Sequence, residues 1–104
     1  MVNLPVVITA AADAEVNLAA EQLENERPGL AREFLKELDS LLNLLAHYPE
    51  SCQRFRGPLR RGFLHRFRYT VVYSVRADAV VIIGVKPSRR NPTQITRWAD
   101  PLPK

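Results

Sequence analysis

The chain has 104 residues and a mass of 11.8 kDa, which suits one domain with one core and is too small for two ordinary domains. Hydrophobic residues make up 46% and charged residues 25%, so the composition excludes disordered and fibrous classes. The apolar runs are far shorter than the ~20 residues that span a bilayer, and the N-terminus does not resemble a secretory signal. We therefore expect a cytoplasmic protein with no membrane span, and the lone Cys52 agrees with that expectation.

The first strand and helix are predicted from the N-terminal residues. Val6–Ile8 are β-branched and predict a short strand, and the hydroxyl of Thr9 can then cap a helix that runs to Glu26. The apolar stripe of this helix is weak. It consists of Val16, Ala20 and Leu23, with Ala14 and Leu18 beside them. Arg27-Pro28-Gly29 interrupts the pattern and predicts a break.

The second helix has the strongest pattern in the sequence. Apolar residues recur at steps of three and four, and Pro49 ends the helix. The stripe consists of Leu30, Phe34, Leu38, Leu41, Leu45 and Tyr48, widened by Leu35 and Leu42. Together the two helices predict a hairpin whose apolar side must be covered by a sheet.

The second half of the chain predicts that sheet. Residues 69–75 alternate with a period of two, which indicates a strand with one buried face formed by Tyr69, Val71, Tyr73 and Val75. Ala77-Asp78 is a turn signal, and the apolar run 80–85 predicts a central strand. Residues 59–64 predict a third strand, followed by a turn near residues 66–68.

The predicted fold is α+β. It has an N-terminal strand, a two-helix hairpin and an antiparallel three-stranded meander, with both helices on one sheet face. We expect residues 1–98 to form a single domain and residues 99–104 to be a frayed tail. The fraying is expected to begin near Pro92, although Ile95 and Trp98 can dock a short turn on the domain.

Charge is divided unequally between the two halves of the chain. Residues 1–52 have three Lys or Arg against nine Asp or Glu, a net −6, whereas residues 53–104 have twelve against two, a net +10. This division favours a basic surface that meets an anionic partner, either a nucleic acid or an acidic protein segment.

No motif for a metal, a nucleotide or a serine nucleophile is present, so no cofactor and no metal are expected. What remains is a set of basic residues that can converge at one end or face of the sheet. The set consists of Arg60, Arg61, His65, Arg66, Arg68, Arg89, Arg90 and Arg97. Guanidinium groups bind phosphate oxygens in bidentate fashion, so the set suits a nucleic-acid backbone or a metal-free RNA cleavage.

Metal-free cleavage also requires groups that transfer protons. The candidates are His65, Tyr69 and Tyr73. The tyrosines share the buried phase of their strand, so packing in the core is the better interpretation for both. A single histidine in a turn is more often only exposed, so a catalytic role for His65 is the less favoured interpretation.

The order of these elements resembles the RelE/ParE superfamily of toxins from type II toxin–antitoxin modules, also called plasmid stabilisation proteins. The resemblance runs from about Val7 to Pro92. It lies in the stretch AREFLKELDSLLNLLAHYPE, in LRRG at Leu59, in RFRYTVVYSV at Arg66 and in VVIIGVKPSRRNP at Val80. It implies a small toxin neutralised by a cognate antitoxin, with DNA gyrase as target in ParE-like members and ribosome-bound mRNA in RelE-like members.

Two departures bear on the target. Pro87 stands where many relatives carry a histidine, and lysines are few among the basic residues. The resemblance carries over Arg60, Arg89 and Arg90, positions that often brace the strands and tail, and for Arg90 a structural and a functional role are equally supported. We favour a ParE-like inhibitor of gyrase that acts by protein binding.

Two alternatives remain open. One is a RelE-like ribosome-dependent endoribonuclease that uses the candidate site residues Arg60, Arg61, His65, Arg89 and Arg90. The other is a non-toxic protein that still binds its antitoxin. Neither requires a membrane or a small-molecule cofactor.

Overall fold

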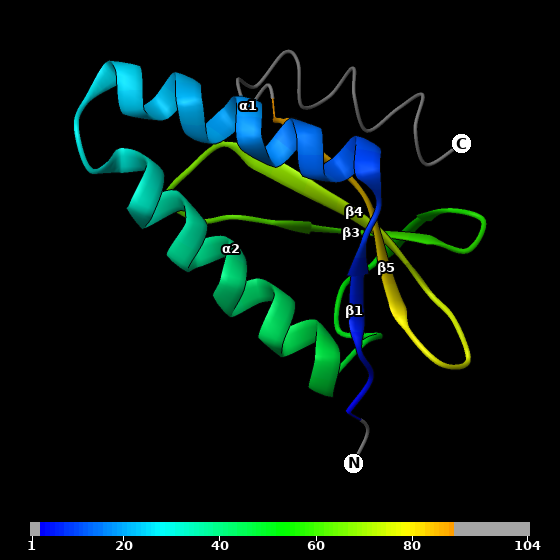
Figure 1. Ribbon diagram of the computed structural model, residues 1–104. Coiled ribbons are helices and arrows are strands. Elements are labelled where there is room, and N and C mark those ends of the chain that lie inside the picture. Colours follow the sequence, from blue (N-terminus) through cyan, green and yellow to red (C-terminus); the bar gives the residue numbers. More distant parts are fainter. Residues whose placement is uncertain (1–2, 89–104) are drawn as a thin grey trace.

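The computed structural model describes residues 3–88 of the chain (Figure 1). The elements occur in the order β1 (Val6–Ile8), α1 (Ala10–Glu26), α2 (Leu30–His47), β2 (Arg54–Arg56), β3 (Leu59–Phe63), β4 (Tyr69–Val75) and β5 (Val80–Pro87). The predictions made for Arg89, Arg90, Arg97 and the tail that contains Ile95 and Trp98 lie outside the described residues. No helix in the described part of the chain is long and apolar enough to cross a membrane.

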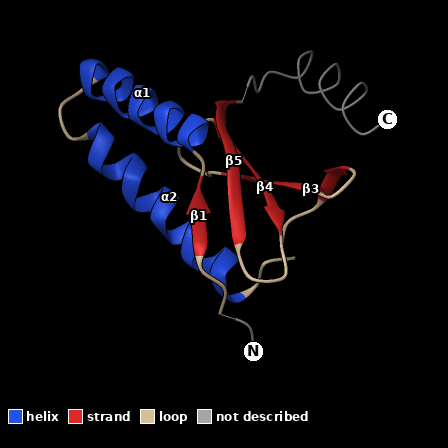
Figure 2. Cartoon of the chain, turned by 45° about the vertical axis from the view of Figure 1, so that its right-hand side comes forward, coloured by secondary structure: helices blue, strands red, loops and turns tan. Residues whose placement is uncertain are grey.

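The predicted α+β class is confirmed, and the sheet has one more strand than expected. Its strand order is β1-β5-β4-β3-β2, with β1 parallel to β5 and every other pair antiparallel. The predicted meander is β3-β4-β5, and β2 was missed. Both helices lie on one side of the sheet (Figure 2). The other side therefore carries the strand residues that point away from the helices.

The first helix begins where the sequence predicts. The N–H of Ala12 donates to Oγ1 of Thr9 at 3.1 Å, which is the expected N-cap bond. The buried positions of α1 are Ala12, Val16 and Ala19. The prediction placed Leu18 beside the apolar stripe, and this was wrong, because Leu18 is 54% exposed. The buried stripe is narrow because two of its three residues are alanines.

The break between the helices is confirmed, and Glu24 holds the corner. Gly29 is the N-cap of α2 with φ of 94°, a left-handed conformation that glycine adopts without strain, and it has no side chain to cap the helix. The Glu24 carboxylate accepts from the N–H groups of Gly29 (3.1 Å) and Ala31 (3.2 Å). A side chain of α1 thus caps the following helix.

The second helix buries the centre of its predicted stripe. Phe34, Leu38 and Leu45 are buried, and α2 ends at His47, before Pro49 as predicted. The two edges of the stripe differ from the prediction, since Leu35 is 43% and Tyr48 is 57% exposed. Tyr48 lies at the helix end, where the chain turns away, and Leu35 lies on the outer flank.

The core lies between the helices and the strands. Its fully buried members include Val71 and Tyr73 of β4 and Val80 of β5, and Phe34 of α2 belongs to the same buried cluster. The Phe34 ring contacts Phe67 edge to face, with centroids 5.8 Å apart. The single buried face predicted for β4 was too simple, because Thr70 and Ser74 are also buried.

Hydrogen bonds explain why these two hydroxyl residues are buried on β4. The hydroxyl of Thr70 bonds that of Ser88, and Oγ of Ser74 accepts from Nε of Arg76 at 3.1 Å. Both side chains are small enough to be covered by the neighbouring strands, and their polar atoms are satisfied.

Candidate functional site

Arg60 is a structural arginine. It lies opposite the buried Tyr73 and points to the helix side of the sheet. Its Nη1 donates to the carbonyl of Cys52 at 2.6 Å and to that of Glu50 at 3.3 Å. These bonds brace the segment that joins α2 to β2, so the side chain holds backbone rather than presenting its charge outward.

Arg61 points the other way, because consecutive residues of a strand face opposite sides of a sheet. Its guanidinium carbon lies 4.9 Å from the centre of the Phe55 ring and 5.7 Å from that of Phe63. The two rings attract the cation and hold it flat against the sheet. Arg60 and Arg61 therefore do not serve one site.

His65 and Arg66 lie in the loop between β3 and β4, which α2 holds in place. The Glu37 carboxylate accepts from the backbone N–H groups of both residues. The guanidinium of Arg66 pairs with Glu33 at 2.6 Å, and Glu33 also pairs with Arg27 at 3.8 Å. The charge of Arg66 is thus compensated within the molecule.

The tyrosines pack in the core region, as their strand phase predicts. The hydroxyl of Tyr73 donates to the carbonyl of Pro49 at 2.9 Å, and the ring of Tyr69 tilts on Phe34 with centroids 5.1 Å apart. Burial raises the pKa of Tyr73 well above its ordinary value, and the neighbouring Cys52 adds to the shift. Burial, and then the charge of Glu26, raise the pKa of Tyr69. Both phenols stay protonated at neutral pH, so neither is a ready proton acceptor.

The described site candidates are therefore dispersed. Arg60 serves the helix side, Arg61 lies on the opposite face and His65 is exposed in the loop. Arg89 and Arg90 lie outside the described residues. Within residues 3–88, no group of three or more His, Cys, Asp or Glu side chains could hold a metal ion.

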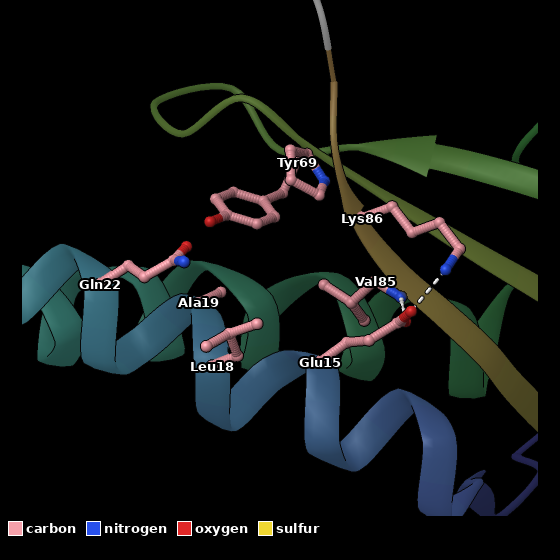
Figure 3. Close-up of a pocket in the computed structure, with 8 residues that line it drawn as sticks. Glu15, Leu18, Ala19, Gln22, Tyr69, Val85 and Lys86 are labelled. Atoms are coloured by element: carbon pink, nitrogen blue, oxygen red, sulfur yellow. Dashed lines mark hydrogen bonds and ion pairs between the residues drawn. The ribbon is translucent and has the colours of Figure 1, made fainter.

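A groove of about 340 Å³ lies between α1 and the end of β5 (Figure 3). It forms because β1 pairs with β5 only along Val80–Ile82, so among residues 3–88 no strand pairs with the later residues of β5 on that edge. Its lining residues are Glu15, Leu18, Ala19, Gln22, Tyr69, Val85, Lys86 and Pro87. The mixture of an exposed leucine, an aromatic ring and an ion pair suits a protein segment.

Glu15 takes the place of a strand at this edge. Its carboxylate accepts from the backbone N–H of Val85 at 2.8 Å and pairs with the ammonium of Lys86. Partial burial raises the pKa of the Glu15 carboxyl, but the bonds from Lys86 and Val85 outweigh this effect and hold the pKa below its ordinary value. Glu15 is therefore charged at neutral pH.

The sequence analysis did not predict that acids of the helices bind the sheet half of the chain. Glu15, Glu33 and Glu37 each bind the sheet half of the chain. These acids are separated from their partners by many more residues in the sequence than the three or four that link neighbours on a helix, so no local pattern predicts these contacts.

The comparisons with known proteins agree with the fold. A family model described as the ParE toxin of the type II toxin–antitoxin system, parDE, matches residues 6–92. Nine chains of solved structures match. One, described as the chromosomal ParDE TA system from P. aeruginosa, has a TM-score of 0.74 and 13% identity, covering 84% of this chain and 98% of that chain. No curated protein matches the sequence.

Proposed function

The chain belongs to the ParE toxin family of type II toxin–antitoxin systems, and we propose that it inhibits DNA gyrase by protein binding and is neutralised by a cognate antitoxin. In this proposal residues 1–98 form the toxin domain and the protein acts in the cytoplasm. Family membership supports the antitoxin as partner. The choice of gyrase over the ribosome depends on the arrangement of the described side chains.

The observation that carries the proposal is the dispersion of the basic residues within residues 3–88. Cleavage of RNA needs cations and proton-transfer groups around one phosphorus atom. Here Arg60 binds backbone carbonyls, Arg66 is paired with Glu33, and Arg61 lies on the face opposite to Arg60. This arrangement favours a surface that recognises a protein over a site that cleaves a phosphodiester.

Two assays with the purified protein test the proposal. The first measures supercoiling of a relaxed plasmid by gyrase, and we expect inhibition that increases with the concentration of the toxin. The second adds the protein to a cell-free bacterial translation reaction and maps new 5′ ends of one defined mRNA by primer extension. We expect intact message, whereas ribosome-dependent cuts in codon phase would replace this proposal with the endoribonuclease.

The variant His65→Ala separates the same alternatives in cells. His65 is exposed, and within residues 3–88 only its backbone N–H is bonded, to Glu37, so the substitution should leave the fold intact. A gyrase inhibitor should keep its toxicity, while a nuclease that depends on His65 should lose it. Normal growth on expression of the wild-type protein would instead support the non-toxic alternative.

A further inference from the structure

The strand β2 is a short edge strand with two exposed arginines. It consists of Arg54, Phe55 and Arg56, and β3 is its single neighbour in the sheet. The register shifts between the two arginines, so Arg54 lies opposite Arg60 and Arg56 lies opposite Leu59. Since Leu59 and Arg60 are consecutive in β3, they face opposite sides, and the two arginines of β2 flank the edge from both sides.

Within residues 3–88, this arrangement concentrates positive charge that no acid compensates. Like charges directly opposite each other on paired strands destabilise a sheet, and Arg54 faces Arg60 in this way. Arg60 is satisfied by carbonyl groups. The guanidinium groups of Arg54 and Arg56 meet no acid among residues 3–88, and the described strands contain no aspartate or glutamate.

Three other cations of the described residues have acidic partners within the molecule. Arg27 and Arg66 share Glu33, and Lys86 pairs with Glu15. The fold can therefore bring helix acids to the sheet half of the chain, and it does so elsewhere. Within residues 3–88 no acid pairs with the arginines of the β2 edge, and an external anion gains most from binding where the charge is uncompensated.

The backbone groups of the β2 edge favour a protein over a nucleic acid as the anionic partner. An edge strand presents N–H and C=O groups that a further strand can bind, and a nucleic acid cannot satisfy them in that way. An added strand also projects side chains to both sides of the sheet, which matches arginines on both sides of the edge. A nucleic-acid backbone would instead be matched by cations gathered on one face.

We propose that the β2 edge binds an acidic extended segment of a protein partner, which adds beside β2 as a further strand and brings carboxylates to Arg54 and Arg56. The inference rests on the proposed function in one respect, since the antitoxin is the partner that would supply this segment. It is separate from the groove between α1 and β5, because β2 and β5 lie on opposite sides of β4 in the sheet.

A titration of the full-length 15N-labelled protein locates the binding. The probe is a synthetic peptide in which glutamate alternates with valine, and a lysine–valine peptide of equal length is the control. We expect shifts of the backbone amides of Gln53–Arg56 and Arg60–Phe63 with the acidic peptide alone. No binding, or shifts centred on Lys86 and the α1 groove, would overturn the proposal. Tighter binding of duplex DNA at the same amides would also overturn it.

The double variant Arg54→Gln, Arg56→Gln gives the size of the effect. Each exposed ion pair contributes about 0.5 kcal/mol, so the variant should bind the peptide about fivefold more weakly at low salt. Arg32→Gln is the matched control, because Arg32 is also exposed but lies on α2. The double variant should melt at or above the temperature of the wild type, since it removes a like-charge pair. Affinity equal to that of the wild type would refute the role of the arginines.

The same variants distinguish this inference from the proposed function. If the wild-type protein inhibits gyrase and binds its antitoxin, but the double variant binds the antitoxin with unchanged affinity, the inference alone fails. If the protein does not inhibit gyrase, the proposed function fails. The peptide titration still decides whether the β2 edge takes an acidic strand, because it requires no activity.

Discussion

The substitution Tyr73→Phe tests whether this tyrosine stabilises the fold or takes part in chemistry. Tyr73 is fully buried, and its hydroxyl donates to the carbonyl of Pro49, a buried residue, at 2.9 Å. The variant keeps the ring and removes the hydroxyl group, which is the hydrogen-bond donor. It therefore leaves the carbonyl of Pro49 without this partner and changes the packing of the ring very little.

The expected cost follows from that single bond. Loss of a hydrogen bond that leaves a buried acceptor unsatisfied costs about 1–3 kcal/mol. For a domain of about 100 residues, each 1 kcal/mol lowers the melting temperature by roughly 4–8 °C. Circular dichroism melts at pH 7 measure the shift. Tyr69→Phe is the control, because no hydrogen bond of its hydroxyl is made within residues 3–88, and it should change stability by less than about 0.5 kcal/mol.

The toxicity of Tyr73→Phe tests the same interpretation. The structural role predicts that Tyr73→Phe remains toxic at a temperature where it is folded. Full loss of toxicity with an unchanged melting temperature would refute this reasoning, since it would mean that the phenol acts in chemistry. The raised pKa adds a pH test: stability from the protonated phenol is present below its ordinary value of 10.0 and is lost as the pH rises above it.

Three further predictions concern stability, each measured by urea denaturation. Glu15→Gln should lower the free energy of unfolding by about 0.5–1.5 kcal/mol at pH 7. Because the folded-state pKa of Glu15 is lowered, this stability is present above the ordinary value of 4.5 and is lost as the pH falls through the folded-state pKa. A difference in stability between wild type and variant that persists in acid would contradict this prediction. Phe34→Ala should lower the free energy of unfolding by about 3–5 kcal/mol, because the ring is fully buried. A loss as small as that caused by substitution of an exposed residue would be inconsistent with this packing. Gly62→Ala would place a Cβ 3.0 Å from Sγ of Cys52 and should cost about 1–3 kcal/mol, and Cys52→Ala should restore part of the loss; no restoration would exclude this contact as the cause.

Much of the fold could be predicted because its main signals are local. The Thr9 cap, the stripe around Phe34 and Leu38, and the turn at Ala77-Asp78 each depend on neighbouring residues. The strand β2 was missed because it has only three residues, two of them arginine and none β-branched, which is too short for an alternating pattern to indicate a strand. The parallel pairing of β1 with β5 joins residues far apart in the chain, which periodicity does not report.

The candidate site was less predictable than the fold. A period of two already places Arg60 and Arg61 on opposite faces, so their separation could have been read from the sequence. The bonds from Glu33 and Glu37 to the loop at His65 and Arg66 could not, because they depend on where α2 lies over the sheet. Local rules give the face of a side chain, and tertiary packing gives its partner.

The pairing of β1 with β5 also sets an order of events during synthesis. Val6 leaves the ribosome well before its partner Val80, which lies 74 residues later in the chain. At about 5–20 residues per second, roughly 4–15 s separate the two. During that interval the apolar faces of both helices have no completed sheet to cover them, so a nascent chain exposes its core to chaperones or to a waiting partner before it becomes a folded toxin.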